Sequence, residues 1–458
     1  MNELVERYFA RLRGRRAAVL GIGVSNRPLI RLLLQYGVDV TAYDRTPRER
    51  LDDEVLALEA QGAKLHVGEN YLDGLEADVI FRTPGMRPDL PQIARLTARG
   101  AELTSEMEAF FEVCPCRIIA VTGSDGKTTT TTLIAKILEH AGRRVWLGGN
   151  IGTPLLPLAA QMEPDDAAVV ELSSFQLMTM TRSADVAVVT NLAPNHLDMH
   201  HGMEEYVAAK KNVFLHQSTD GRLVLNLDNG ITRGFAAEAR GTVEFFSRTA
   251  RPERGVYLEN GVIYRNGEKI MDAADIRIPG VHNIENYMAA ACAVEGFASD
   301  ADIDAVARSF GGVEHRIELV RELDGVRYYN DSIASSPTRT IAGLHSFAQP
   351  VILIAGGYDK HIPFDVLGPE ICAHVKTLIL CGATADKIRA AVLAAPAYAE
   401  GRPVILDAEN LEQAVSLARE SARAGDVVTL SPACAAFDQF KNFMVRGEMY
   451  KKLVHELK

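Results

Sequence analysis

Short runs of β-branched and other apolar residues alternate with helical stretches along the whole chain, and this alternation constrains the fold more than any other feature. Parallel strands need a crossover of a dozen or more residues, usually a helix. Strands that alternate with helices therefore predict parallel sheets covered by helices. At 458 residues the chain is long enough for about three domains of about 150 residues, each with its own core. The sequence predicts an α/β protein of three domains.

The predicted strands fall into three groups. They are 17–20, 39–44 and 77–81 in the first; 117–121, 143–147, 167–171, 186–190 and 223–227 in the second; and 327–329, 351–355, 377–381, 403–406 and 427–430 in the third. Within 256–270, Asn260-Gly261 and Asn266-Gly267 are hairpin signals, so this stretch is predicted to be a β-rich insert. Because no long linker separates the groups, boundaries come from counting strand–helix units. They give domains of residues 1–108, 109–312 and 313–458.

Composition limits the class of protein and of partner. Hydrophobic residues make up 47% and charged residues 24% of the chain, which is typical of a soluble globular enzyme. The net charge of −11 disfavours a nucleic-acid partner, because phosphate contacts need clustered Lys and Arg. No apolar run is long enough to span a membrane, and the charged start of the chain is unlike a secretory signal peptide. Six scattered cysteines favour reduced thiols and a cytoplasmic protein. We expect a monomer.

The strongest local signal for chemistry follows the predicted strand 117–121. It reads Thr122-Gly123-Ser124-Asp125-Gly126-Lys127-Thr128 and leads into a helical run. Glycines let backbone N–H groups face phosphate oxygens, Lys127 adds a point charge, and the Thr128 hydroxyl can ligate Mg²⁺. Val121 stands where the usual P-loop has its first glycine, so the pattern is a shortened G-x-x-G-K-T. We interpret it as a nucleoside triphosphate site rather than a chance glycine turn.

Candidate metal and catalytic residues follow two neighbouring strands. Glu171 ends the strand 167–171, and an acid at the carboxyl end of a strand beside a P-loop strand is where a second Mg²⁺ ligand is expected. His196 follows the strand 186–190 and is expected at the mouth of the same sheet. A zinc site of His196, His200 and His201 is disfavoured, because the segment has no H-E-x-x-H pattern and no nearby cysteine.

A second glycine-rich turn supports a rival interpretation. Gly21-Ile22-Gly23-Val24-Ser25-Asn26 follows the first strand, and Asp44 ends the next, which nearly reproduces the dinucleotide fingerprint. An NAD-dependent dehydrogenase is therefore the alternative from another class. Against it, Asn26 replaces the third glycine, and a dehydrogenase would leave the phosphate loop unexplained. A non-catalytic nucleotide-binding protein is the third alternative. The candidate catalytic side chains that argue against it are Lys127, Glu171, His196 and Lys210.

Taken together, the motifs resemble the Mur ligase superfamily, in order and over essentially the whole chain. Besides the phosphate loop, the matching segments are Gly148–Gly152, Glu171–Leu177, Asn191–Asp198, Ala208–Lys210, Gly280–Asn286, His315-Arg316, Asn330–Ser332, Gly356–Lys360 and Ser431–Lys441. The resemblance implies an ATP-dependent amide-bond ligase of peptidoglycan synthesis that activates a carboxylate as an acyl phosphate. It also implies a Rossmann-like N-terminal domain for a UDP-linked substrate, a P-loop ATPase-like central domain, and a Rossmann-like C-terminal domain that admits an amino acid and closes over the site.

The resemblance also implies roles for matching residues. Lys127 and Thr128 would contact phosphates and Mg²⁺, with Glu171 as a further metal ligand, while His196 and Lys210, the latter as its carbamate, would hold a second Mg²⁺. The implied nucleotide contacts are Gly123, Ser124, Asp125, Gly126, Lys127, Thr128, Thr129, Asn283, Asn286, Arg316 and Asp331. The implied contacts with the UDP-linked substrate are Val24, Ser25, Asp44, Arg45, Thr83, Gly85 and Asn150.

Among family members, the resemblance is strongest to those that add D-glutamate to UDP-N-acetylmuramoyl-L-alanine, chiefly through the segment that begins at Ser431. Other amino-acid-adding members and folylpolyglutamate synthase remain alternatives. The implied contacts for the amino acid are Ser335, Lys360, Phe437 and Phe443. The chain departs from the pattern at Ile333, where a Lys is usual, and at Ala436, where a Ser is frequent. Ser335, Ser336 and Arg339 are candidates to compensate, although Arg339 could equally lie on a solvated helix.

Overall fold

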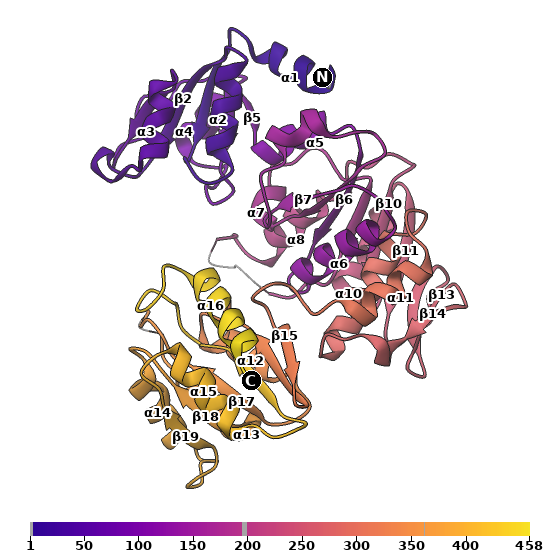
Figure 1. Cartoon of the computed structure of the whole chain (residues 1–458). Coiled ribbons are helices and arrows are strands. Elements are labelled where there is room, and N and C mark those ends of the chain that lie inside the picture. The colour runs from indigo at the N-terminus through magenta and orange to yellow at the C-terminus, as the bar shows by residue number, and fades with distance from the viewer. Residues whose placement is uncertain (1–2, 195–198, 361) are drawn as a thin grey trace. The chain divides into compact units, whose positions relative to one another are not determined.

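The computed structural model describes residues 3–194, 199–360 and 362–458, and it contains three sheets (Figure 1). The chain divides into two compact units. The first comprises Met1–Ala273 with Glu285–Val306 and holds the first two sheets, whereas the second comprises Ala274–Ile284 with Ala307–Lys458 and holds the third. The α/β fold class predicted from the sequence is confirmed. Each sheet lies within one of the three predicted domains, while the domain boundaries themselves stay predictions.

The first sheet is entirely parallel, with strand order β3-β2-β1-β4-β5. Its strands are β1 (Arg16–Leu20), β2 (Asp39–Asp44), β3 (Lys64–Val67), β4 (Val79–Arg82) and β5 (Glu102–Thr104). The accompanying helices are α1 (Glu3–Leu12), α2 (Asn26–Gln35), α3 (Asp53–Ala60), α4 (Pro91–Ala98) and α5 (Glu106–Val113). Ser105 caps α5 by accepting a hydrogen bond from the Glu108 N–H. The order reverses between β1 and β4, and loops that diverge at such a point form a ligand-binding crevice.

The second sheet has nine strands in the order β14-β13-β12-β11-β10-β9-β6-β8-β7. They are β6 (Arg117–Thr122), β7 (Val145–Gly149), β8 (Ala167–Glu171), β9 (Val186–Val189), β10 (Arg222–Asn226), β11 (Thr242–Ser247), β12 (Gly255–Glu259), β13 (Val262–Arg265) and β14 (Glu268–Asp272). The helices are α6 (Lys127–His140), α7 (Ser174–Leu177), α8 (Met203–Lys211), α9 (Gly230–Gly234), α10 (Val281–Ala293) and α11 (Asp300–Ser309). The central strands are fully buried apolar runs, as a parallel sheet covered on both faces requires.

The β-rich insert predicted near 256–270 is confirmed. Strands β12, β13 and β14 pair antiparallel through two tight turns. In the first turn Asn260 and Gly261 have φ of 50° and 77°, and in the second Asn266 and Gly267 have φ of 49° and 99°. Two successive residues with positive φ favour Asn-Gly, which explains why the sequence signal is reliable here.

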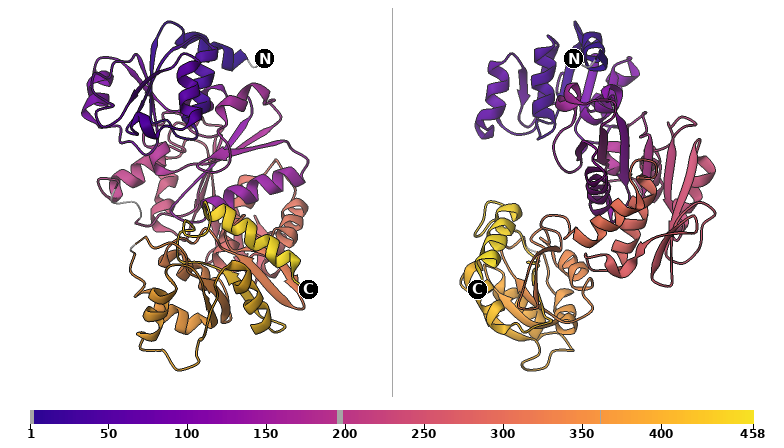
Figure 2. Two further views of the ribbon diagram at one scale, coloured as in Figure 1. Left: turned by 60° about the vertical axis from the view of Figure 1, so that its left-hand side comes forward. Right: turned by 45° about the vertical axis from the view of Figure 1, so that its right-hand side comes forward.

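The third sheet has the order β15-β16-β20-β17-β18-β19, with β15 antiparallel to β16 and the others parallel. Its strands are β15 (Glu318–Leu323), β16 (Val326–Asn330), β17 (Val351–Ala355), β18 (Val375–Leu380), β19 (Val404–Asp407) and β20 (Val427–Leu430). Its helices are α12 (Pro337–Leu344), α13 (Leu367–His374), α14 (Ala385–Leu393), α15 (Leu411–Ser421) and α16 (Phe443–Glu456). Successive β17 residues enter separate cores on its two faces, and helices lie on both sides (Figure 2).

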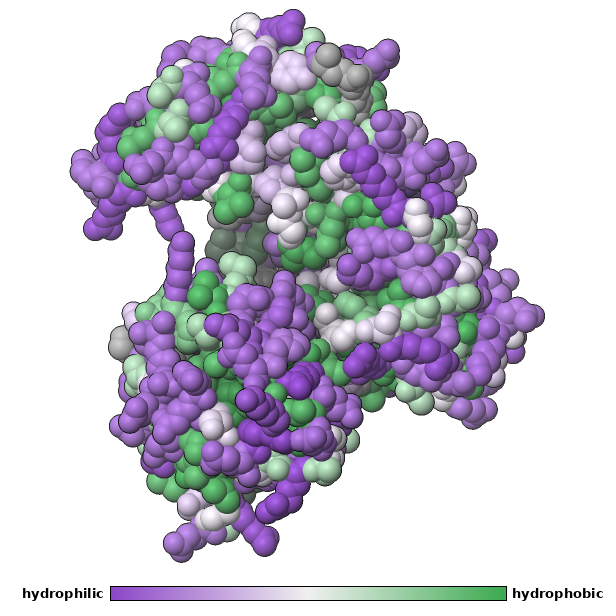
Figure 3. Space-filling view, viewed as in Figure 1, coloured by the Kyte–Doolittle hydropathy of each residue, from purple (hydrophilic) through white to green (hydrophobic). Residues whose placement is uncertain are grey.

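The face seen in Figure 3 is covered mainly by hydrophilic residues, with hydrophobic ones scattered between them. No helix in the described ranges combines the length and apolar character that a membrane crossing requires.

Candidate functional site

The loop between β6 and α6 has a backbone that only glycine can supply at two positions. Gly123 has φ of 148°, and a Cβ there would lie 1.9 Å from Thr190 Oγ1. Gly126 has φ of 78°, and a Cβ there would lie 2.4 Å from Asn286 Oδ1. The loop ends at the N-terminus of the 14-residue helix α6, and the first N–H groups of a helix favour anions. The predicted phosphate loop therefore has the backbone geometry of an anion site.

The segment after β9 holds this loop in place. The Ser124 N–H donates to Asn191 O at 2.8 Å, and the Asp125 N–H donates to Asn191 Oδ1 at 3.0 Å. The Ser124 hydroxyl lies 2.9 Å from both Ala193 O and the Tyr206 hydroxyl. The Asn191–Asp198 motif was singled out in the sequence for His196. In its described part, Asn191 and Ala193 hold the phosphate loop through the hydrogen bonds just given.

Lys127, Thr128 and Thr129 form the first turn of α6, and all three are half-buried. Lys127 Nζ donates to Gly123 O at 3.0 Å and to Ser124 O at 2.8 Å. The loop's own carbonyls therefore hold the ammonium group at the anion site. A charge fixed in this way needs little reorganisation to meet phosphate oxygens.

Lys210 is the second lysine at this loop, and only 1% of it is exposed. Its Nζ donates to Thr122 Oγ1 at 3.0 Å and to Gly123 O at 2.9 Å, and it lies 5.0 Å from the centre of the Tyr206 ring. Burial, reinforced by the nearby charge of Lys127, lowers the pKa of Lys210 well below its ordinary value. Lys210 therefore has far more neutral-amine character than a surface lysine.

Glu171 ends β8, the strand that pairs with β6, and its side chain is buried. Its Oε1 accepts a hydrogen bond from Asn150 Nδ2 at 2.7 Å, whereas its buried Oε2 has no hydrogen-bond partner among the described residues. A buried carboxylate oxygen is costly to leave unpaired. Glu171 therefore fits a role as ligand of a bound cation.

The predicted role of His196 cannot be compared with the structure, because residues 195–198 lie outside the described ranges. The other two histidines of the segment have separate surroundings. His200 is buried, lies 2.9 Å from Ser174 Oγ and stacks on Phe175 with ring centroids 5.2 Å apart. His201 is exposed and lies 3.2 Å from Asp89. Neither belongs to a cluster of metal-ligating side chains among the described residues.

The loops after β1 and β2 hold most of the residues predicted to contact the UDP-linked substrate. Asp44 is half-buried, and its carboxylate accepts hydrogen bonds from the N–H groups of Ile22 at 2.7 Å and Thr46 at 2.9 Å. Burial acts to raise the pKa of Asp44, but these hydrogen bonds outweigh it and lower the pKa. Asn26 is buried and donates to Gly21 O at 2.8 Å. It fills the place of the third glycine of a dinucleotide fingerprint.

The remaining predicted residues of this group follow strands of the first sheet, except Asn150, which follows β7 of the second sheet. Thr83 follows β4, and its N–H donates to Leu20 O at 3.0 Å, so it lies at the switch point between β1 and β4. The exposed members are Val24, Arg45, Gly85 and Asn150, and Ser25 is half-buried. Val24 is 82% exposed and is therefore accessible to a ligand.

Two buried arginines were not predicted from the sequence. Arg82 ends the otherwise apolar strand β4, and its guanidinium donates to Met86 O at 2.5 Å and Phe175 O at 2.8 Å. Arg446 in α16 donates to Ser332 O at 2.9 Å and Cys434 O at 3.0 Å. Burial lowers the pKa of each to about 10. The burial of Arg446 could have been predicted from helical spacing, because Arg446 shares a helical face with the buried Tyr450 and Val454.

The predicted nucleotide contacts beyond the loop fall in both units. Asn286, in the first unit, accepts a hydrogen bond from Thr130 Oγ1 at 3.2 Å, which places it beside the loop. In the second unit, Asp331 is buried and accepts a hydrogen bond from Ser431 Oγ at 2.7 Å. Burial raises the pKa of Asp331 to about 7. Asn283 is buried and Arg316 half-buried.

The predicted amino-acid contacts lie in the second unit, where two are exposed and two are half-buried. Lys360 is exposed and Ser335 is half-buried. Phe437 is 61% exposed and meets Tyr358 edge-on, with ring centroids 5.8 Å apart. Phe443 is half-buried against His315. Arg339 is also exposed and donates to Ile333 O at 3.4 Å.

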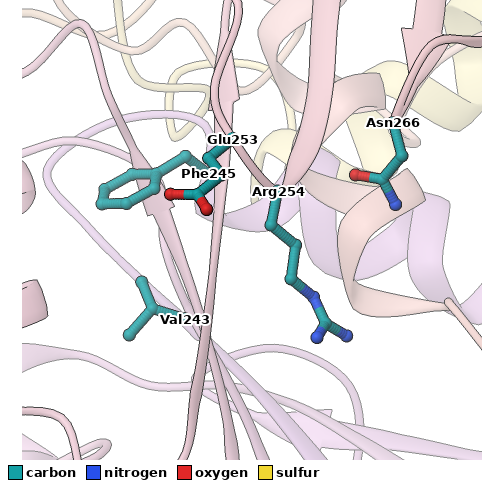
Figure 4. Close-up of a pocket in the computed structure, with 5 residues that line it drawn as sticks. All are labelled: Val243, Phe245, Glu253, Arg254 and Asn266. Carbon is teal, nitrogen blue, oxygen red and sulfur yellow. The ribbon is translucent and has the colours of Figure 1, made fainter.

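A pocket of about 480 Å³ lies away from these residues, in the β-rich insert (Figure 4). Its lining side chains are Val243, Phe245, Glu253, Arg254 and Asn266. In the sheet order, β11 is separated from β6 by β10 and β9, and strands are about 4.8 Å apart, so the pocket is well over 10 Å from the phosphate loop. It takes no part in the candidate site.

A glycine loop, two lysines and a buried acid at one sheet edge define a P-loop type of nucleotide-binding protein. The model of the Mur ligase middle domain matches residues 121–294, and that of the Mur ligase glutamate ligase domain matches residues 315–434. Together they match more than half of the chain. The chain belongs to the Mur ligase family, as the sequence motifs predicted.

Relatives and solved structures agree with this assignment. The chain is 53% identical to UDP-N-acetylmuramoylalanine--D-glutamate ligase of Acetivibrio thermocellus, over 100% of both chains, and 51% identical to that of Clostridium acetobutylicum, over 98% of both. Two solved structures share the fold. UDP-N-acetylmuramate-alanine ligase of Thermotoga maritima has a TM-score of 0.57 at 16% identity, over 97% of this chain and 100% of that one. UDP-N-acetylmuramoyl-L-alanyl-D-glutamate--2,6-diaminopimelate ligase has a TM-score of 0.58 at 17% identity, over 97% and 93%.

Proposed function

We propose that the protein is an ATP-dependent ligase that joins D-glutamate to UDP-N-acetylmuramoyl-L-alanine in peptidoglycan synthesis. The observation that carries the proposal is the convergence of Lys127, Lys210 and Glu171 on one anion-binding loop. Relatives named for this activity that are about half identical over the full chain support the choice of substrates. We further propose a cytoplasmic monomer with domains 1–108, 109–312 and 313–458, which serves cell shape and division through the cell wall.

The reaction has two steps, formation of an acyl phosphate and formation of the amide. A carboxylate oxygen of UDP-N-acetylmuramoyl-L-alanine attacks the γ-phosphorus of ATP, which forms an acyl phosphate and releases ADP. The amine of D-glutamate then attacks the acyl carbon, loses a proton, and phosphate leaves as the amide forms. Phosphoryl transfer depends mainly on positioning and charge neutralisation, and Lys127 at the loop supplies both.

The candidate site suits Mg²⁺ as well as ATP. Thr128 and Glu171 offer the oxygen ligands that Mg²⁺ prefers, and the unpaired buried Oε2 of Glu171 is suited to a cation. Mg²⁺ would neutralise negative charge on the phosphates. For a second Mg²⁺ we propose His196 and the carbamate of Lys210. The other proposed nucleotide contacts are Gly123, Ser124, Asp125, Gly126, Thr129, Asn283, Asn286, Arg316 and Asp331.

The surroundings of Lys210 support its carbamylation. Burial lowers its pKa and so favours the neutral amine, whose nitrogen can attack CO₂ and release one proton to form a carbamate anion. That anion would reverse the charge beside Lys127. Protein incubated with ¹³C-labelled bicarbonate should show one carbamate resonance that Lys210→Ala abolishes and Lys211→Ala keeps. An unlabelled Lys210 in active enzyme would contradict the proposal.

The proposed substrate contacts fall in the two units. For the UDP-linked substrate they are Val24, Ser25, Asp44, Arg45, Thr83 and Gly85, around the crevice of the first sheet, and Asn150, after β7 of the second sheet. For D-glutamate they are Ser335, Lys360, Phe437 and Phe443. Val24 and Phe437 are exposed, so both are accessible to a ligand.

One assay separates the alternatives of different classes. Release of ADP should require ATP, the UDP-linked acceptor and the amino acid together. A dehydrogenase would instead change the absorbance of NAD, and a binding module would do neither. The dehydrogenase is disfavoured, because the Asn26 side chain occupies the third-glycine position of the dinucleotide fingerprint.

A further inference from the structure

Two clusters of histidine and acidic side chains lie in the second unit. In the described ranges they are the groups whose potential ligand atoms all lie within 4.8 Å of one another. The first comprises His345, Glu370 and His374, which we term the α12–α13 cluster, and the second comprises Glu314, His315 and Glu448. The proposed ligase reaction uses neither cluster as a metal site, so each is a candidate for an additional metal site.

The second cluster is already neutralised by a lysine. Lys451 Nζ lies 2.7 Å from Glu314 and 3.1 Å from Glu448, and also pairs with Glu318 at 3.2 Å. His315 is buried, and its Nδ1 lies 2.9 Å from the amide nitrogen of Asn330. A fixed ammonium among the carboxylates would repel a metal ion. This cluster is explained as an ion-pair network.

The α12–α13 cluster has a different charge arrangement. His345 Nε2 lies 2.7 Å from Glu370 Oε2, and His374 Nε2 lies 3.6 Å from the same oxygen. The two imidazole rings are 4.9 Å apart between centroids and inclined by 59°. The ion pairs of Glu370 within the described ranges are with these two histidines, not with Lys or Arg. The cluster therefore offers two imidazoles and one carboxylate around a shared point.

The spacing suits a small divalent ion. Bonds of about 2.0–2.2 Å in a tetrahedron place neighbouring ligand atoms about 3.3–3.6 Å apart. The observed separations of 2.7 Å and 3.6 Å need only small rotations of the side chains to meet this range. All three side chains are partly exposed, so an ion can enter and water can complete the coordination.

The backbone places the three ligands on two adjoining helix ends. His345 is the residue after α12, while Glu370 and His374 are four apart on α13, which puts both on one face of that helix. Helices α12 and α13 pack together. The ligand set therefore depends on tertiary structure and would not survive unfolding.

The cluster lies at the opposite edge of the third sheet from the proposed substrate contacts. His374 immediately precedes β18, whereas Gly356-Gly357 and Cys381 follow the carboxyl ends of β17 and β18. The five residues of β17 span about 16 Å. An ion at the cluster would therefore be separate from the proposed chemistry on this sheet.

We propose that His345, Glu370 and His374 form a binding site for a borderline divalent transition metal such as Zn²⁺. Two imidazole nitrogens and one carboxylate suit Zn²⁺, whereas Mg²⁺ prefers oxygen ligands. The ion joins α12 to α13 and stabilises the folded second unit.

The test is a titration of the chelator-treated full-length protein with Zn²⁺ by calorimetry, in excess Mg²⁺. One site is expected, and its affinity should fall about tenfold or more in His374→Ala and in Glu370→Gln. Glu448→Gln, in the lysine-neutralised cluster, is the matched control and should bind Zn²⁺ like wild type. Zn²⁺ should also raise the Tm of wild type and not of His374→Ala, because a ligand of the folded state stabilises it.

Each result decides the proposal. If His374→Ala and Glu370→Gln both bind Zn²⁺ with unchanged affinity, Zn²⁺ binds elsewhere and the proposed site is wrong. The absence of saturable Zn²⁺ binding by wild type would also overturn the proposal. Glu370→Gln keeps the side-chain shape, so a fold lost in His374→Ala does not remove the test. Ligase activity of His374→Ala without Zn²⁺ serves as the check of folding and should equal that of wild type.

Discussion

The phosphate loop of the second sheet and the amino-acid contacts proposed in the third sheet hold their cations in different ways. Lys127 is fixed by backbone carbonyls before any ligand arrives. Lys360 and Arg339 are exposed. Fixed charges are suited to stabilising a transition state, because they need no reorganisation during the reaction. Exposed ones must be ordered by the ligand itself, which lowers their contribution to affinity.

The sharpest way to break this comparison is Lys127→Ala. Loss of the fixed charge should lower kcat by about 100-fold or more, since it acts mainly on the transition state. Steady-state ADP release at saturating ATP measures the effect. Lys136→Ala is the matched control, because Lys136 lies on the same helix and pairs with Glu139 at the surface. Retention of more than about a tenth of wild-type turnover would contradict the assignment of the loop.

Lys210→Ala should also leave the enzyme nearly inactive. If the carbamate is the active form, short carboxylic acids added to the assay should restore part of the activity, because they replace its oxygen ligands. Lys211→Ala is the control, as Lys211 forms a surface ion pair with Glu238. Full activity of Lys210→Ala would remove the lysine from the mechanism, whereas inactivity without rescue would remove only the carbamate.

Lys360→Ala tests the exposed side of the comparison. It should raise KM for D-glutamate about tenfold and change KM for ATP little, because an exposed partner serves binding more than chemistry. Arg339→Ala should raise KM for D-glutamate only if Arg339 replaces the Lys that is usual at the position of Ile333. An unchanged KM for D-glutamate in both variants would move its binding site away from these residues.

The smallest expected effect concerns Asp331. Burial raises its folded-state pKa to about 7 from an ordinary value of 3.8, so the folded state binds a proton more tightly than the unfolded chain. The stability it contributes is full below about pH 4 and is lost as pH rises through about 7. Tm should therefore fall between about pH 5 and pH 8 more in wild type than in Asp331→Asn. The exposed Asp365→Asn is the control, and identical pH profiles of wild type and Asp331→Asn would contradict the shift.

The phosphate loop was well predicted from the sequence, because the residues that determine its conformation are local. Gly123 and Gly126 have backbone conformations that few other residues tolerate, and a strand and a helix flank them. The strands β3, β5, β11 and β15 were not predicted. Of these, β3, β5 and β15 are short or half-exposed edge strands without an apolar run. Their existence depends on pairing with a neighbour.

Tertiary contacts account for what sequence reasoning missed in the site. The carbonyls that hold Arg82 come partly from a helix more than 90 residues away in sequence, and those that hold Arg446 come from loops after β16 and β20. No local pattern reports such acceptors. The amino-acid contacts were predicted from a resemblance, and substitutions at Ile333 and Ala436 make their roles depend on experiment.

The central claim is the choice of substrates, and a panel of amino acids tests it most directly. Purified protein with ATP, Mg²⁺ and UDP-N-acetylmuramoyl-L-alanine is given D-glutamate, L-glutamate, L-alanine or L-lysine, and initial ADP release is measured. We expect D-glutamate to support by far the fastest rate, with product and ADP formed in equal amounts. Faster use of another amino acid would contradict the substrate assignment, and ADP release that needs no amino acid would contradict the ligase itself.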